Sequence, residues 1–425
     1  MTKNKDILVI GAGLAGIEAS LLSAQAGRKV YLIEQTSYFG GSAIKSEEVF
    51  PNMECATCML APKQSDLLEN KNIELMTLSE MKDIKGDAGN FTVKITKHAR
   101  YVSLVNCIGC GACFEPCPVS VDNEFEERIS KRKAIYLPCA GALPNAPAID
   151  MKYCLRQAKG EECALCKEAC MFDAIIYDDK DEEIEITVGA IIVATGFRLG
   201  DSKQFTQYGY GKFENVFNAF EFERLRASNG PTSGVIQTRD GKAPKSIGLI
   251  HCVGRDAKGY CSQVCCMYLI KFAHYALNKL PGVKVYQFYK ELSIPGKGNQ
   301  KFYHEVQEKG VKSIRAREIE VTKNGNDSGL KITFQNEKAD KESVDVDMVV
   351  LAPYIEPHPG TDTLAKLLGI DLGDFGFFKT AEFSATETAR PGIFVAGCAE
   401  GPKFMQDVVI QAQAAVAHAL NATED

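Results

Sequence analysis

Clustered cysteines are the residues of this sequence best suited to do chemistry. The 425-residue chain has 16 cysteines, and the densest run is Cys107, Cys110, Cys113 and Cys117, closed by Pro118. Cysteines at this spacing wrap a [4Fe–4S] cluster, and the small residues between them let the backbone approach it closely. Pairs of cysteines two residues apart also suit tetrahedral zinc. The full order of the run with its terminal proline favours iron–sulfur chemistry.

A second run lies further along the same stretch. Its members are Cys154, Cys163, Cys166 and Cys170. In bacterial two-cluster ferredoxins the fourth cysteine of each run ligates the other cluster. The first predicted cluster is therefore held by Cys107, Cys110, Cys113 and Cys170. The second is held by Cys117, Cys154, Cys163 and Cys166. Cys139 fits neither set, and we interpret it as structural.

Two further cysteine groups leave alternatives open. Cys252, Cys261, Cys265 and Cys266 could hold a third cluster, form a redox dithiol or be inert buried thiols. Cys261, Cys265 and Cys266 are expected to open a helix that runs to about Leu280. Cys55 and Cys58 could be a redox pair, a pair of ligands or packing residues.

A glycine loop near the N-terminus predicts a dinucleotide site. Gly11, Gly13 and Gly16 stand between an apolar strand, 6–10, and a helix over 14–25. In this context the glycines let the backbone approach a pyrophosphate at the start of the helix. Glu34 ends the next strand, where a carboxylate accepts hydrogen bonds from a ribose 2′-hydroxyl.

Three features favour FAD over NAD as the dinucleotide. Gly40 and Gly41 follow Glu34, and the strand over 190–196 ends in Ala194, Thr195 and Gly196, as in two-dinucleotide-binding flavoproteins. Gly397 and Cys398 end a third matching motif, in which an aspartate usually stands at the position of Cys398. The helix expected over 407–420 could direct its N-terminus at the flavin, with Lys403 close by.

The expected second nucleotide site is degenerate. The strand over 245–250 leads into HCVGRD rather than a glycine loop, and thiols follow where a nicotinamide pyrophosphate would bind. This argues against direct use of NAD(P)H.

Composition bounds the class of protein. The chain is 45% hydrophobic and 24% charged with a net charge of −6, typical of a globular protein and without the basic excess of a nucleic-acid partner. No apolar run approaches the roughly 20 residues that cross a bilayer, and no signal peptide is evident. Unpaired metal-ligating cysteines fit a reducing compartment, hence the cytoplasm.

The elements that position these residues suggest an α/β flavoprotein with two dinucleotide-binding domains and an insertion. In two-dinucleotide-binding flavoproteins, strands such as those expected at 91–96 and 183–188 would be near neighbours, yet here both cysteine runs lie between them. The expected parts are the first FAD segment 1–100, a ferredoxin-like insert 101–180, the FAD strand 181–200, a middle domain 201–345 and a final FAD segment 346–425.

The sequence resembles the A subunits of the heterodisulfide reductase family. The matching stretches are GAGLAGIEA, FPNMECATCMLAPK, CIGCGACFEPCP, KAIYLPCAGALPNAPAID, HCVGRDAKGYCSQVCC and GIFVAGCAEGP. The resemblance implies a thioredoxin-reductase-like body with FAD, an inserted ferredoxin domain, and an unusual cluster bound by cysteines of the body. It favours iron at Cys252, Cys261, Cys265 and Cys266.

The resemblance also implies a function in a complex. With 425 residues the chain has a compact form, and in this it is most similar to the A subunits of quinone-interacting membrane-bound oxidoreductases. We therefore expect electron transfer between FAD and [4Fe–4S] clusters and on to partner subunits, linking a quinone-reactive membrane partner to adenylylsulfate reductase. Contact with the inner face of the membrane would be made only through a partner. The alternatives are a self-contained NAD(P)H-dependent reductase, similar to the glutamate synthase small subunit, and a non-catalytic scaffold.

Overall fold

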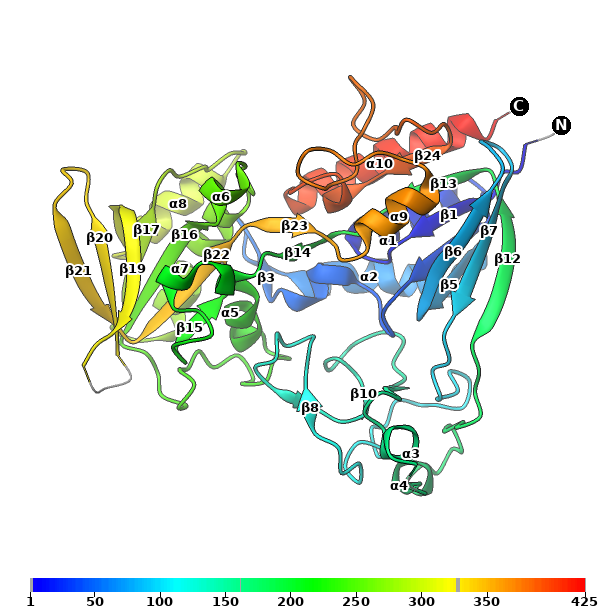
Figure 1. The fold of residues 1–425 in the computed structure, drawn as a ribbon, viewed down its shortest axis with the longest axis horizontal. Coiled ribbons are helices and arrows are strands. Elements are labelled where there is room, and N and C mark those ends of the chain that lie inside the picture. Colours follow the sequence, from blue (N-terminus) through cyan, green and yellow to red (C-terminus); the bar gives the residue numbers. More distant parts are fainter. Residues whose placement is uncertain (1–2, 161, 326–328, 425) are drawn as a thin grey trace.

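Short apolar strands form the central sheet of the N-terminal part. The computed structural model describes residues 3–160, 162–325 and 329–424. Continuous Ile, Leu and Val runs suit parallel strands that are buried on both faces. The sheet has the order β24 (Ile393–Val395), β13 (Ala190–Val193), β1 (Ile7–Ile10), β2 (Val30–Glu34) and β5 (Ile73–Thr77). Helices α1 (Leu14–Gln25) and α10 (Met405–Ala422) pack together over one face (Figure 1).

A three-stranded antiparallel sheet and α9 (Thr361–Leu368) share a core with the other face. The strand order of this antiparallel sheet is β12 (Glu182–Val188), β7 (Phe91–Lys97) and β6 (Ser79–Lys85). Lys97 at the end of β7 pairs with Glu182 at the start of β12. The strands expected on either side of the cysteine runs are therefore neighbours, and the intervening chain leaves and re-enters the sheet at one point.

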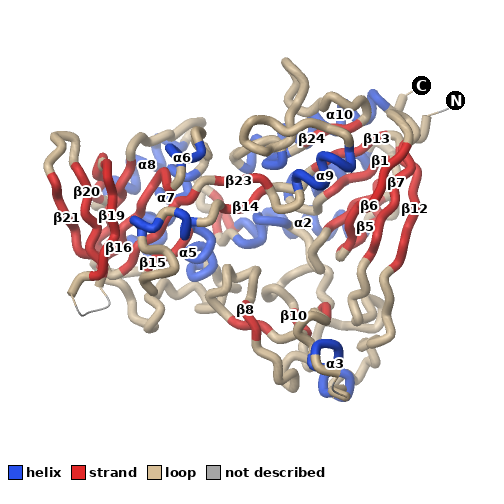
Figure 2. The backbone as a smooth tube through the Cα atoms, viewed as in Figure 1, coloured by secondary structure: helices blue, strands red, loops and turns tan. Residues whose placement is uncertain are grey.

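The inserted segment has little regular structure and forms a separate lobe (Figure 2). Its strands pair two by two, β8 (Val121–Asp122) with β9 (Lys131–Arg132) and β10 (Ile135–Tyr136) with β11 (Ala148–Ile149). Two single-turn helices, α3 (Leu155–Ala158) and α4 (Leu165–Glu168), lie at its tip (Figure 1). Loops dominate the inserted segment because its closely spaced cysteines and turns interrupt the apolar periodicity that a long helix or strand needs.

The middle part is a second parallel sheet with helices. Its order is β15 (Val216–Asn218), β22 (Met348–Pro353), β16 (Ser246–Val253), β17 (Lys284–Tyr289) and β18 (Lys312–Arg315). The helices are α5 (Ala219–Arg226), α6 (Arg255–Lys258), α7 (Cys265–Lys279) and α8 (Asn299–Glu308). The outer sheet has β19 (Arg317–Lys323), β20 (Leu330–Gln335) and β21 (Lys341–Val346).

Strand β22 corrects one expected boundary. It lies within the segment 346–425 that was expected to be FAD-binding, yet it pairs in parallel with β15 and β16. The chain crosses between the two parts on a short antiparallel pair, β14 (Phe197–Leu199) with β23 (Ile355–Pro357). The middle part therefore extends to Pro353, eight residues beyond 345, because its central sheet has β22 between β15 and β16.

Remaining short elements connect these parts. A hairpin of β3 (Glu48–Val49) and β4 (Glu54–Cys55) precedes α2 (Ala56–Glu69). The 3-10 turns are η1 (Gly41–Lys45), η2 (Ser202–Gln204), η3 (Thr206–Tyr208) and η4 (Gly397–Ala399). In the described portion of the chain, no helix has both the length and the apolar character that a bilayer crossing requires.

Candidate flavin site and cysteine groups

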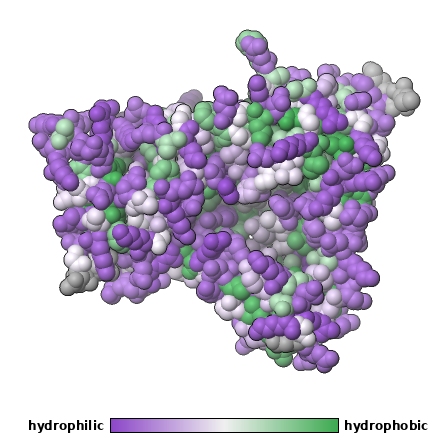
Figure 3. All heavy atoms as spheres, in the orientation of Figure 1, coloured by the Kyte–Doolittle hydropathy of each residue, from purple (hydrophilic) through white to green (hydrophobic). Residues whose placement is uncertain are grey.

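A cavity of about 1200 Å³ opens where the parallel strands of the N-terminal sheet end. Eight of the predicted flavin residues line it: Gly11, Gly13, Glu34, Gly41, Ala194, Thr195, Gly196 and Cys398. The predicted Gly16, Gly40 and Gly397 are not among the lining residues. Residues of the insert and of the middle part complete the wall, and the surface is visibly hollowed between the lobes (Figure 3).

The glycines hold this part of the cavity open. Gly11 has φ +101°, and a Cβ there would lie 2.5 Å from the Ala194 carbonyl oxygen. Gly41 has φ +61°, and its Cβ would lie 2.7 Å from the Gly13 Cα. A Cβ on Gly16 would come within 1.8 Å of the Gly11 carbonyl oxygen, so this glycine seats α1 on β1. Two backbone loops thus approach each other at the N-terminus of α1, a suitable cradle for a pyrophosphate.

Glu34 is held in place by three hydrogen bonds. One carboxylate oxygen accepts from the Ala12 N–H at 2.9 Å, and the other accepts from both the N–H and the hydroxyl of Thr36 at 2.9 Å each. These donors keep the side chain at the cavity wall. Its remaining lone pairs can accept hydrogen bonds from ribose hydroxyls.

Thr195 and Cys398 bring polar atoms to the same cavity. The Thr195 hydroxyl is buried and has no hydrogen-bond partner among the described residues, as expected of a group that awaits a ligand. Burial raises the pKa of the Cys398 thiol to about 11, so it is a neutral side chain. Its sulfur contacts the Lys403 carbonyl oxygen at 4.0 Å.

The first turn of α10 lines the cavity from Met405 to Val408. The positive end of the helix dipole therefore faces the cavity. Lys403 also lines it, with its ammonium group in an ion pair with Glu400. These residues and the glycine cradle fit an anionic dinucleotide such as FAD.

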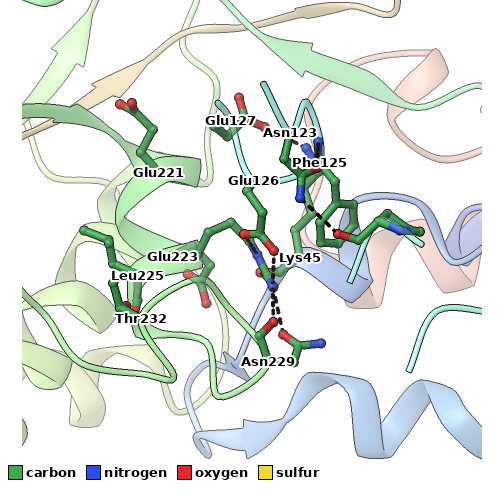
Figure 4. A network of polar contacts seen from close by, with 12 residues as sticks. Lys45, Asn123, Phe125, Glu126, Glu127, Glu221, Glu223, Leu225, Asn229 and Thr232 are labelled. Carbon is green, nitrogen blue, oxygen red and sulfur yellow. Dashed lines mark hydrogen bonds and ion pairs between the residues drawn. The ribbon is translucent and has the colours of Figure 1, made fainter. Parts of the chain in front are cut away.

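The insert contributes to the cavity wall through the loop after β8. Glu127 lines the cavity and pairs with Lys45 at 2.6 Å. Next to it, the fully buried Arg224 of α5 donates to both oxygens of Glu126 at 2.7 and 3.0 Å. Arg224 also donates to the Asn229 side chain at 2.9 Å. Figure 4 shows this network, which joins the insert to the middle part.

The cysteines assigned to the second cluster lie together. Cys117, Cys154, Cys163 and Cys166 line one small cavity of about 20 Å³ in the insert. Burial raises the pKa of the Cys166 thiol, and the Tyr177 hydroxyl at 3.2 Å acts in the opposite direction.

Most of the cysteines assigned to the first cluster also lie close to one another. Burial raises the pKa of the Cys113 thiol to about 12, with neighbouring Cys107 and Cys170 acting in the same direction. Backbone N–H groups reach two of these sulfurs at 3.4 Å, Gly109 to Cys107 and Ala174 to Cys170. The fourth member, Cys110, is exposed.

Within the described ranges, no group of three or more His, Cys, Asp or Glu side chains is arranged to hold a metal ion. The assignment of these cysteines to clusters therefore rests on their spacing and grouping, and stays a prediction.

The third group gathers where β16 ends and α7 begins. Cys252 has φ +59° near the end of β16, and Cys265 and Cys266 are the first residues of α7. Cys261 does not open the helix as expected, because a loop separates it from the start of α7 at Cys265. The interaction with Cys265 lowers the pKa of Cys266, and the Ser293 N–H reaches its sulfur at 3.4 Å.

Two functional candidates in this region escaped the sequence analysis. His251 is 2% exposed and lies beside the Cys266 thiol, whose pKa it lowers. Tyr268 lines the flavin cavity, while its buried hydroxyl has no hydrogen-bond partner among the described residues. Only the position of Tyr268 one turn after Cys265 could have drawn attention to it.

Cys55 and Cys58 are joined by a disulfide at the start of α2. This bond excludes the simple packing of two free thiols. The hairpin that carries Cys55 continues into the cavity wall at residues 48–52.

Known proteins resemble the chain at two levels. A family described as FAD dependent oxidoreductase matches residues 6–57, which hold the glycine cradle and Glu34. The A subunit of the H(2):CoB-CoM heterodisulfide,ferredoxin reductase of Methanothermobacter marburgensis is 41% identical over 423 residues. The iron-sulfur A subunit of the CoB–CoM heterodisulfide reductase of Methanocaldococcus jannaschii is 40% identical over 421 residues. Over nearly its whole length, the chain is similar to heterodisulfide reductase A subunits.

The match covers 97% of this chain and 63% of each of these two relatives, so the chain spans less than two thirds of their length. The expected resemblance to this family is thereby confirmed.

Solved structures confirm the expected fold class. The thioredoxin reductase of Lactococcus lactis gives a TM-score of 0.54 at 15% identity, covering 98% of this chain and 98% of its own. That of T. acidophilum gives 0.53 at 12% identity, covering 98% and 97%. Likeness at this identity speaks for the fold alone, a thioredoxin-reductase-like α/β body.

Proposed function

We propose that the protein is an FAD and iron–sulfur electron-transfer component of a multi-subunit oxidoreductase. The observation that carries the proposal is the shared wall of the flavin cavity. The N-terminal sheet supplies the glycine cradle, the insert that bears both cysteine runs supplies Glu127, and Tyr268 comes from the helix that begins with Cys265. Each predicted redox group therefore belongs to a part of the chain that also contributes to the cavity wall.

FAD exchanges electrons singly or in pairs, whereas a [4Fe–4S] cluster exchanges one at a time. The chain's residues bind and orient these groups. The glycine cradle and Glu34 hold the dinucleotide, and the positive end of α10 favours negative charge on it. In the insert, N–H donors to Cys107 and Cys170 stabilise thiolate ligands and raise the potential of a bound cluster.

The third group, Cys252, Cys261, Cys265 and Cys266, is proposed as the site of a further cluster. All four side chains are close enough for Cys252, Cys261 and Cys266 to raise the pKa of Cys265. The buried imidazole of His251 lies beside Cys266 and favours the thiolate form of this thiol, which is the form that binds iron.

The self-contained NAD(P)H reductase is the less favoured function. The turn after β16 holds Gly254 and the single-turn α6 rather than a glycine-rich loop and a long helix. Electrons would then come from partner proteins. We include in the proposal a quinone-reactive membrane partner and adenylylsulfate reductase, which co-purification from the native organism would test.

The decisive experiment measures iron, acid-labile sulfide and flavin in anaerobically purified protein, followed by titration with NADH and with dithionite. About twelve irons per FAD would support three clusters, and about eight would confine them to the insert. Bleaching of the flavin by dithionite but not by NADH would support the partner-dependent role. Rapid bleaching by NADH would contradict it.

Single substitutions refine this measurement. We expect Cys163→Ser to lose about four irons per chain, because a cubane needs four ligands. Cys139→Ser is the matched control, since this thiol lies outside every set, and it should retain the full iron content. Equal iron in the two variants would contradict the assignment of Cys163.

A further inference from the structure

The disulfide between Cys55 and Cys58 belongs to none of the predicted cluster sites. All other cysteines of the chain are free thiols. A sequence separation of three closes a very short loop, and short loops gain least from cross-linking the unfolded chain. The bond therefore contributes little as a structural staple, which directs attention to its chemistry.

The two sulfur atoms have different surroundings. Cys58 is exposed, whereas Cys55 is half-buried. The Cys55 sulfur accepts the Cys58 N–H at 3.2 Å and lies 3.4 Å from the Thr57 hydroxyl. It also caps a 14-residue helix without an acidic residue in the first turn. Donors and the helix dipole both stabilise a thiolate at Cys55, so Cys55 is the better leaving group.

The pair stands on the outer side of the flavin cavity wall. Cys55 pairs with Glu48 in the β3–β4 hairpin, and residues 48–52 of that hairpin line the cavity. Helix α2 packs against the loop at Gly40 and Gly41. A Cβ on Gly40 would meet Leu60 and Gln64 of this helix. The disulfide is thus both accessible from solvent and attached to the flavin site.

We propose that Cys55–Cys58 is a second redox site that exchanges electron pairs with dithiol or disulfide substrates. A thiolate of a dithiol attacks the Cys58 sulfur, a mixed disulfide forms, and Cys55 leaves as the thiolate. The second thiol of the substrate then displaces Cys58. The substrate ends as a disulfide, and its two electrons and two protons end on the Cys55 and Cys58 thiols. The reverse reaction reduces a disulfide substrate.

The first test titrates the pair in the folded holoprotein. Anaerobic full-length protein is equilibrated with mixtures of reduced and oxidised dithiothreitol, quenched with N-ethylmaleimide and digested. We expect the peptide with Cys55 and Cys58 to change from no label to two labels within the series. A disulfide that opens only after unfolding, or a pair that is labelled in every mixture, would overturn the proposal.

The second test separates the two sulfurs. The oxidised protein is treated briefly with reduced glutathione, quenched with N-ethylmaleimide and digested, and the glutathione should be found on Cys58 at least about tenfold more often than on Cys55, because exposure controls access. Equal labelling, or labelling mainly of Cys55, would overturn the assignment of Cys58 as the attacked atom. Cys139→Ser serves as the control, with wild-type behaviour expected of the pair.

Iron is measured in the same samples. Low iron with a reducible pair would contradict the proposed cluster function and leave this site standing. Full iron content with a disulfide that cannot be reduced in the folded protein would support the cluster function and contradict this redox site.

Discussion

Glu34 illustrates how a single side chain is prepared for a ligand. Its two oxygens accept three hydrogen bonds from Ala12 and Thr36, which set the direction of the carboxylate before any ribose binds. Thr195 is the complementary case, because its buried hydroxyl has no partner in the described parts of the chain. Both residues line the cavity, so the loss of either affects the ligand more than the fold.

For Glu34→Gln we expect FAD affinity to fall by at least about tenfold, since a hydrogen bond to a charged group contributes roughly 1.5–3 kcal/mol. The flavin fluorescence of reconstituted apoprotein measures this affinity. Glu74→Gln is the control, because Glu74 is exposed on the neighbouring β5 and pairs only with Lys29 among the described residues. A control that loses as much affinity as Glu34→Gln would contradict the assigned role.

Gly41→Ala should reduce the FAD content of the purified protein strongly. The new Cβ would lie 2.7 Å from the Gly13 Cα, so the cradle must open. Gly27→Ala carries the same kind of strain at φ +78° but meets no atom within 4 Å. It should cost about 1–2 kcal/mol of stability and retain FAD. Loss of FAD from Gly27→Ala alone would show that backbone strain, rather than the cradle, decides binding.

At the scale of elements, a buried ion pair helps to hold the insert against the middle part. Arg224 on α5 is fully buried and donates to Glu126, which lies beyond β8 (Figure 4). The stacking of the Arg224 guanidinium near the Phe125 ring, 4.9 Å from its centroid, adds to this contact. The loop that carries Glu127 to the flavin cavity therefore depends on α5.

Arg224→Met should lower the free energy of unfolding by about 3–5 kcal/mol, because Glu126 is left as an unpaired buried charge. Urea denaturation followed by circular dichroism measures the change. Arg315→Met removes an exposed pair with Glu337 and should cost at most about 1 kcal/mol.

The double variant Arg224→Met/Glu126→Leu tests the cause. It should recover most of the loss, since no buried charge remains. A double variant as unstable as Arg224→Met would contradict the electrostatic explanation.

At the scale of the whole molecule, the flavin cavity is the place where all three parts meet. Its wall includes Gly41 of the N-terminal part, Glu127 of the insert and Tyr268 of the middle part. A ligand that fills it would contact all three parts at once. Binding should therefore stabilise the arrangement of the lobes and not only the dinucleotide-binding sheet.

We expect FAD at 100 times its dissociation constant to raise the free energy of unfolding by about 2.7 kcal/mol. Hydrogen exchange should show protection at residues 40–52, 123–129 and 194–201. The outer strands β20 and β21 are the internal control and should exchange at an unchanged rate. Protection confined to the N-terminal part would contradict a cavity shared by the three parts.

The sequence by itself determined features that depend on residues close along the chain. Gly11, Gly13 and Gly16 predicted a strand, turn and helix that the structure contains, because φ above zero and close packing there admit little else. The ligand sets assigned to the two cysteine runs stay a prediction from their spacing. Residues 91–96 predicted their pairing with 183–188 because an insertion must leave and return at neighbouring strands.

Tertiary structure decided what depends on residues far apart along the chain. The addition of β22 to the middle sheet, the start of α7 at Cys265 and the approach of Glu127 to Lys45 follow from packing between distant segments. Tyr268 becomes a candidate only because its buried hydroxyl has no partner among the described residues, and His251 only because the fold brings it beside Cys266. Such contacts are made when whole faces are buried together, and no local pattern of residue types records which faces will meet.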